Sequence, residues 1–227
     1  MQHKRITLFA GHYGSGKTNI AVNYALALRK EGKKVNIADL DIVNPYFRTK
    51  DSAKELKKAG IDLISPQYAN SNVDLPALPA EAYRIVEDKS SFSVVDIGGD
   101  DRGAYALGRY VPGILKENDY RMVFVANCYR PLTRTADEAI EVMREIENAC
   151  SLKFTDIVNN SNLGTQTEEE TILDSVAFIE ELQQKTNLPL FMTTVRADLA
   201  DAISKKVDCV LPLELQKKYF DLPSQKI

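Results

Sequence analysis

Short runs of apolar and β-branched residues alternate along the chain with longer segments whose apolar residues recur every three or four positions. The first pattern is typical of buried strands and the second of amphipathic helices. We therefore expect a first strand over Ile6–Ala10 and a helix over Lys17–Lys30, separated by a glycine-rich turn. Further strands are expected over residues 34–39, 61–64, 92–97, 121–127, 154–159 and 189–193.

The second half of the chain contains two more apolar stripes with helical spacing. The first comprises Ala136, Ala139, Ile140, Met143 and Ile146, and the second comprises Ile172, Val176 and Ile179. Strands that alternate with helices predict an α/β fold, in which about seven mostly parallel strands form a twisted sheet with helices on both faces. Since no shift of composition marks a boundary, we expect a single domain over residues 1–227, with a short carboxyl-terminal tail from about residue 211.

Composition and charge exclude several classes of protein. Apolar residues make up 44% of the 227 residues and charged residues 27%, which is ordinary for a globular domain. The net charge of −3 provides no basic field for nucleic acid, so no specific nucleic-acid partner is expected. No apolar run approaches the roughly 18 residues of a membrane span. Cys128, Cys150 and Cys209 are isolated, which predicts neither a zinc site nor a disulfide framework and favours a cytoplasmic location.

The turn after the first strand matches the phosphate-binding pattern G-x-x-x-x-G-K-[ST]. Its glycines allow backbone N–H groups to surround phosphates, and the following helix contributes the positive end of its dipole. Lys17 is expected to reach the β- and γ-phosphates, and the Thr18 hydroxyl to bind Mg²⁺. The alternative is a glycine-rich turn that matches by accident. The predicted nucleotide contacts are Gly11, Gly14, Ser15, Gly16, Lys17, Thr18 and Asn19.

Acidic residues end two of the predicted strands. Asp39 and Asp41 end the second strand and, being two apart, point to the same face. Asp96 ends the fourth strand and resembles a Walker B aspartate that holds Mg²⁺, and Gly98 and Gly99 could bring a backbone N–H to the γ-phosphate. Ligands of open parallel sheets bind at the carboxyl ends of the strands, so these residues predict a Mg²⁺ site with Asp39 and Asp96 as ligands. Ordinary solvated turns are the alternative.

Together the phosphate loop, the D-x-D sequence at Asp39 and the D-x-G-G sequence at Asp96 resemble the ParA/MinD/ArsA/NifH-type NTPases. This SIMIBI superfamily of CobQ/CobB/MinD/ParA nucleotide-binding domains belongs to a broader group that includes the signal-recognition GTPases and dethiobiotin synthetase. The resemblance covers roughly residues 4–205. It implies that Asp41 orients the attacking water and that Lys17 and Thr18 bind phosphate and Mg²⁺. ParA and MinD carry a signature lysine after the first glycine, where this chain has His12.

The residues after the strand at 154–159 bear on the choice of base. GTPases of the broader group carry N-K-x-D at this place, where the aspartate accepts hydrogen bonds from guanine. This chain has Asn160 and Asn162 in place of the lysine and the aspartate, and a neutral amide cannot present two acceptors to guanine. Asn159 could pair with adenine, so ATP is the predicted nucleotide, although a plain polar turn is the alternative.

These observations predict a Mg²⁺-dependent ATPase whose conformation follows its nucleotide, with ATP and Mg²⁺ as cofactors and Asp41 and Lys17 as catalytic residues. As the resemblance implies, it would act on a client protein or a metal centre and could form a nucleotide-dependent homodimer. Two alternatives remain open. One is a small-molecule phosphotransferase or synthetase of the dethiobiotin-synthetase kind, and the other is a scaffold that binds ATP, dimerises and does not hydrolyse it.

Overall fold

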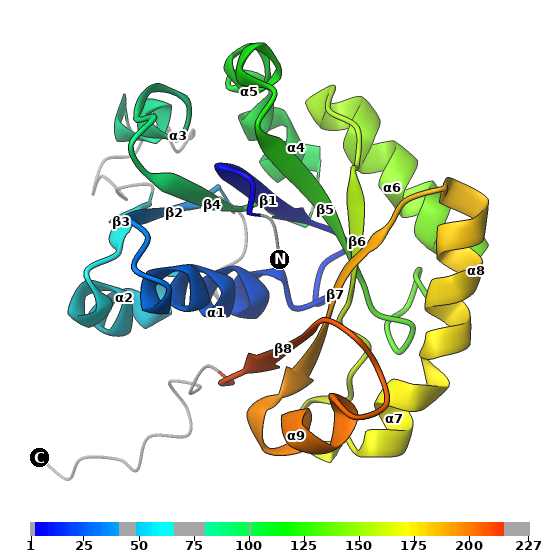
Figure 1. Cartoon of the computed structure of the whole chain (residues 1–227). Helices are drawn as coiled ribbons and strands as arrows, with labels where there is room; N and C mark the ends of the chain where they lie inside the picture. The colour runs from blue at the N-terminus through cyan, green and yellow to red at the C-terminus, as the bar shows by residue number, and fades with distance from the viewer. Residues whose placement is uncertain (1–2, 41–48, 66–79, 100, 216–227) are drawn as a thin grey trace, which may run out of the picture.

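The computed structural model describes residues 3–40, 49–65, 80–99 and 101–215 (Figure 1). Its centre is one sheet in which all eight strands of the described part of the chain run parallel, in the order β3-β2-β4-β1-β5-β6-β7-β8. The α/β fold predicted from the alternating pattern is confirmed. The strands are β1 (Ile6–Ala10), β2 (Val35–Asp39), β3 (Asp62–Ile64), β4 (Phe92–Asp96), β5 (Tyr120–Ala126), β6 (Asp156–Asn159), β7 (Leu190–Arg196) and β8 (Val210–Leu213).

Helices cover both faces of the sheet (Figure 1). The apolar side chains of α1 and α2 pack on one face, and those of α3, α4, α5, α6 and α8 pack on the other. A smaller apolar cluster joins α7 and α9 to β7. The helices are α1 (Lys17–Lys30), α2 (Ala53–Ala59), α3 (Arg84–Glu87), α4 (Asp101–Gly108), α5 (Val111–Glu117), α6 (Ala136–Cys150), α7 (Glu169–Asp174), α8 (Val176–Thr186) and α9 (Ala200–Ile203).

The sheet differs from the prediction by one strand. The sequence predicted about seven strands and a tail from about residue 211, but β8 pairs with β7 at the edge of the sheet. Pro212 lies within β8 and hides it from the pattern, because proline is rare in strands except at sheet edges. The rest of the predicted tail, residues 216–227, and Asp41 lie outside the described residues.

The helix predicted around Ile172 and Ile179 is two helices, α7 and α8. The break occurs at Ser175, whose hydroxyl donates to the Ile172 carbonyl at 2.6 Å and accepts from the Asn159 amide at 2.9 Å. Serine competes with helix hydrogen bonds in this way. The break therefore ties the start of α8 to the carboxyl end of β6. None of the helices in the described part of the chain is long and apolar enough to cross a membrane.

Strand order determines where a ligand can bind. The chain leaves β1 towards β2 on one side, and after β4, which lies between them, it continues to β5 on the other side of β1. Such a reversal opens a crevice at the carboxyl ends of the strands, the usual ligand site of open α/β sheets. The segment between β1 and α1, with the phosphate-loop pattern, lies at this reversal.

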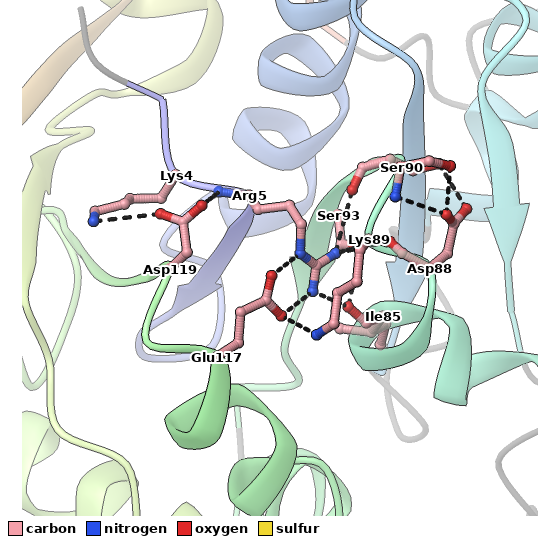
Figure 2. A network of polar contacts seen from close by, with 10 residues as sticks. Lys4, Arg5, Ile85, Asp88, Lys89, Ser90, Ser93, Glu117 and Asp119 are labelled. Atoms are coloured by element: carbon pink, nitrogen blue, oxygen red, sulfur yellow. Dashed lines mark hydrogen bonds and ion pairs between the residues drawn. The ribbon is translucent and has the colours of Figure 1, made fainter.

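At the opposite end of the sheet, where the strands begin, charged side chains form a network of hydrogen bonds and ion pairs (Figure 2). The buried Arg5 guanidinium pairs with Glu117 at the end of α5 and donates to the Ile85 carbonyl at 2.8 Å. Lys89 also pairs with Glu117. Burial by itself raises the pKa of the Glu117 carboxyl, but the hydrogen bonds and charges of Arg5 and Lys89 outweigh it and lower this pKa. The network joins α3, α5 and β1 far from the crevice.

Candidate nucleotide site

The phosphate loop runs from Gly11 to the first turn of α1. A Cβ at Gly11 would lie 2.8 Å from the Val125 carbonyl oxygen, so the loop leaves β1 in direct contact with β5. Gly14 and Gly16 have positive φ angles of 75° and 94°, which a residue with a side chain rarely adopts. The loop conformation therefore depends on the glycines that the sequence pattern singled out.

The amino terminus of α1 differs from that of α6. Helix α6 is closed by its own residues, since Thr135 and Glu138 form a capping box. Helix α1 begins after Gly16, which has no side chain that could cap the first N–H groups of the helix. These N–H groups and the helix dipole make such a terminus a binding place for anions. The amino terminus of α1 is therefore compatible with the predicted phosphate site, and the support for that site comes from the loop residues around it.

Lys17 bends back over the loop. Its buried side chain donates from Nζ to the His12 carbonyl at 3.1 Å. Gly99, after β4, lies against the same place, because a Cβ there would come within 2.8 Å of the Tyr13 amide nitrogen and 2.9 Å of the Lys17 Nζ. Only glycine fits so close an approach. The neighbouring Gly98 is buried and belongs to the same loop after β4.

The two predicted metal ligands lie side by side. Asp39 on β2 and Asp96 on β4 are partners in the parallel register, with only 3% and 1% of their surfaces exposed. Their neighbours Ile37 and Val94 belong to the face covered by α1, so by strand alternation both carboxylates project to that face. Thr18, half-buried in the first turn of α1, supplies a hydroxyl on the same side.

These groups suit Mg²⁺ with a nucleotide. Carboxylate and hydroxyl oxygens are the donors that Mg²⁺ prefers, and it is usually held by one or two carboxylates together with substrate phosphates. Gly16 and Gly99 pack closely against Asn160, Tyr13 and Lys17, where a Cβ would collide, so these glycines keep the loop and the Lys17 ammonium together beside the two carboxylates. Among the residues that the structure describes, no group of three or more His, Cys, Asp and Glu side chains is arranged around a metal position.

Two predicted residues have local partners. The backbone carbonyl of Asn19, the third residue of α1, accepts from the Asn23 side-chain amide at 2.8 Å. The His12 ring nitrogen Nδ1 lies 3.0 Å from the Tyr13 carbonyl oxygen. His12 is thus engaged with its own loop in this structure.

Asn159 is buried, with its side-chain groups in use. Its amide donates to the Ser175 hydroxyl at 2.9 Å, and its side-chain oxygen accepts from the Ser161 N–H at 3.0 Å. These are the donor and the acceptor with which Asn159 was expected to pair with adenine. The amide keeps a second N–H and a second lone pair, but Asn159 is only 2% exposed, so its contact with the base stays a prediction. Asn162 is engaged too, because its amide donates to the Asn160 carbonyl at 2.7 Å.

Asn160 braces the phosphate loop, a role that sequence reasoning missed. Its buried amide donates to the Ser15 carbonyl at 2.6 Å, and its side-chain oxygen accepts from the Thr194 hydroxyl at 2.6 Å. A Cβ at Gly16 would lie 2.2 Å from the Asn160 amide nitrogen, so glycine there makes room for the brace. The Asn-Asn pair after a buried strand was the available signal, but we interpreted Asn160 only as a replacement in N-K-x-D.

Replacing Asn160 by alanine is expected to leave the Ser15 carbonyl buried without its donor. The free energy of unfolding should fall by about 1–3 kcal/mol. Nucleotide affinity should fall about tenfold, because the loop that surrounds the phosphates loses a hydrogen bond that holds it in place. A tenfold loss corresponds to about 1.4 kcal/mol of binding free energy. Urea denaturation and nucleotide titration would measure the two effects. Asn148, exposed on α6, provides a matched Asn→Ala control. Nucleotide binding by Asn160→Ala as tight as that of the wild type would contradict the brace.

The fold of the chain has counterparts among solved structures. The chain has the P-loop NTPase fold. It is similar to the cell division protein FtsY of Thermotoga maritima, with a TM-score of 0.54 and 16% identity over 84% of this chain and 61% of that one. FtsY of Mycoplasma mycoides gives a TM-score of 0.56 and 17% identity over 86% and 62%.

A third similar structure is the signal recognition particle receptor FtsY of Elizabethkingia anophelis in complex with GDP. Its TM-score is 0.50, with 12% identity over 86% of this chain and 58% of that one. The chain thus spans about three fifths of the length of these FtsY chains. No family model and no curated protein matches the sequence. The finer resemblance to ParA- and MinD-type proteins stays a prediction.

Proposed function

We propose that the protein binds a Mg²⁺-nucleotide at the phosphate loop and hydrolyses it slowly, as an ATPase that switches conformation and acts on a client protein or a metal centre. The observation that carries this proposal is the convergence at one place of a glycine-rich loop that leads into a helix, a buried lysine and two adjacent buried carboxylates. Each group is suited to a different part of the same ligand. The helix terminus and Lys17 match phosphate, and Asp39 and Asp96 match its cation.

Each residue has a distinct role in this proposal. The N–H groups of Gly14, Ser15 and Gly16 surround the phosphates, and Lys17 binds the β- and γ-phosphate oxygens. Thr18, Asp39 and Asp96 hold the metal. Mg²⁺, when bound, neutralises charge on the phosphate oxygens and fixes their positions.

The proposed hydrolysis involves two further residues. Gly99, which lies beside Lys17, offers a backbone N–H towards the terminal phosphate. Asp41, outside the described residues, orients the attacking water. These two roles distinguish a hydrolase from a protein that only binds the nucleotide.

The proposed base is adenine. A carboxylate recognises guanine because both of its oxygens accept hydrogen bonds from the base. The side-chain amide of Asn162 has only one acceptor oxygen. That one oxygen accepts from the Gly164 N–H at 3.0 Å. The FtsY of Elizabethkingia anophelis has been solved with GDP, so guanine nucleotides are the informative competitors.

Competitive titration tests both the nucleotide site and the base. We expect the wild-type protein to bind Mg²⁺-ATP, to bind Mg²⁺-GTP at least several-fold more weakly, and to release phosphate from ATP in a Mg²⁺-dependent reaction. Asn162→Asp should shift the preference towards GTP, because the second carboxylate oxygen restores an acceptor. Leu163→Asp places the same charge one residue later and serves as the control. Tighter binding of GTP by the wild type would contradict the proposed base, and no binding of either nucleotide would contradict the site.

A protein partner is proposed to contact the protein at the carboxyl ends of the strands, where the nucleotide is proposed to bind. Tyr13 on the phosphate loop is exposed by 56%, and Tyr105 on α4, the helix that follows the Gly99 loop, is exposed by 68%. Exposed tyrosines are enriched in protein interfaces. A client protein or a second copy of the chain that covers these residues would sense the phosphate loop directly. Dimerisation in the presence of ATP, measured by sedimentation, separates the two.

A further inference from the structure

We propose that Thr49 is a positioning residue of the metal site, which fixes the orientation of the Asp96 carboxylate for Mg²⁺. This inference rests on the proposed function, because it assumes that Asp96 serves a Mg²⁺-nucleotide. It adds a residue that the phosphate-loop and strand-end motifs do not contain. Thr49 begins the short 3-10 helix Thr49–Ser52, between β2 and α2.

The Thr49 hydroxyl donates to the Asp96 Oδ2 at a distance of 3.1 Å. Thr49 is fully buried, with 0% of its surface exposed, and the carboxylate is buried too. A hydrogen bond in such surroundings is not contested by water and is stronger than the same bond at the surface. The contact joins residues on two different elements, so it depends on the tertiary structure.

The adjacent carboxylate of Asp39 gives this hydrogen bond its importance. Asp39 and Asp96 are register partners on neighbouring strands, and two buried carboxylates so close together repel one another. A hydroxyl donor offsets part of this cost. It also takes one of about four lone-pair positions on the carboxylate and thereby selects which way the others face.

Threonine suits this task better than other hydroxyl residues. Its β-branched side chain has few χ1 rotamers, so the hydroxyl direction is well defined. The 3-10 helix that begins at Thr49 packs against α1, the helix that carries Thr18. The segment that begins at Thr49 therefore contacts the same helix that supplies the proposed hydroxyl ligand.

A purely structural role predicts a different result from a positioning role. If the hydroxyl only satisfies a buried carboxylate, its removal lowers stability and weakens nucleotide binding equally with and without Mg²⁺. If it orients Asp96 for the metal, its removal raises the Mg²⁺ concentration needed for binding. Residues that orient metal ligands typically change metal affinity by about 10- to 100-fold when replaced.

The experiment titrates a fluorescent ATP analogue into the full chain at a series of Mg²⁺ concentrations and, separately, in EDTA. Thr49→Val is expected to raise the half-saturating Mg²⁺ concentration about tenfold and to leave the affinity in EDTA unchanged. Thr49→Ser, which keeps the hydroxyl, should stay within about twofold of the wild type. In the Asp96→Asn background, Thr49→Val should cause no further change, because its effect passes through the carboxylate.

Thr155 provides the matched control. Its hydroxyl donates to the Asp156 carboxylate at 2.7 Å, the same kind of bond, at the amino end of β6 and away from the site. Thr155→Val should leave the Mg²⁺ dependence unchanged. If Thr49→Val does not give a folded protein by thermal melting, Thr49→Ala removes the hydroxyl without placing a methyl group against the carboxylate.

The outcomes separate this inference from the proposed function. Wild-type Mg²⁺ dependence in a folded Thr49 variant would overturn the positioning role, and so would an equal loss of affinity in Mg²⁺ and in EDTA. Either result would leave the nucleotide site standing. A wild-type protein that binds no nucleotide at any Mg²⁺ concentration would instead overturn the proposed function itself.

Discussion

Lys17→Ala is expected to weaken the binding of Mg²⁺-ATP by at least about 100-fold, while the protein stays folded. Hydrogen bonds to a charged group contribute about 1.5–3 kcal/mol each, and Lys17 is placed to make two with phosphate oxygens. The side chain is buried beside Gly99 and bends back to the His12 carbonyl, over the backbone that would surround the phosphates. Its removal takes away the positive charge that the phosphate loop directs at the nucleotide.

Isothermal titration of the variant and the wild type would measure this loss. Lys54→Ala, on the exposed surface of α2, makes the same change of charge elsewhere and should bind as the wild type does. A thermal melt of Lys17→Ala close to that of the wild type would show that the loop change is local. Wild-type affinity in Lys17→Ala would rule out the phosphate site.

Asp41→Ala is expected to leave ATP affinity within a few-fold of the wild type and to slow hydrolysis by about 10²-fold or more. Groups that accept or orient the reacting proton typically contribute 10²–10⁴-fold to the rate. Asp39→Ala should behave differently, because Asp39 lies beside Asp96 in the sheet and is proposed to hold the metal. Its loss should weaken Mg²⁺ dependence and nucleotide binding together.

Single-turnover hydrolysis with binding measured in parallel would distinguish the two variants, since it separates the chemical step from affinity. Asp208→Ala, exposed before β8, is the control for loss of an acidic side chain and should change neither quantity. Undiminished hydrolysis in Asp41→Ala would refute the water-orienting role. It would also favour the phosphotransferase, in which this position would serve a substrate instead of water.

Much of the sheet could be predicted because its signals are local. The strands β1, β2, β4 and β5 are short runs of mainly apolar residues buried in the sheet, and such runs stand out in the sequence. β8 was missed because an edge strand needs fewer apolar residues, and its exposed Pro212 argues against a strand. The break between α7 and α8 was missed because it depends on Asn159, which reaches Ser175 from another element.

The sequence by itself determined the phosphate loop and the acidic strand ends, because each is a contiguous motif whose chemistry follows from neighbouring residues. Only the tertiary structure decided which of these ends meet. It inserts β4 between β1 and β2, which brings Asp96 beside Asp39.

The tertiary structure also assigned Thr49 to Asp96 across 47 residues and Asn160 to Ser15 across 145. Hydrogen bonds over such separations arise from the packing of whole elements. No local pattern encodes them, because the partners become neighbours only when the sheet has formed.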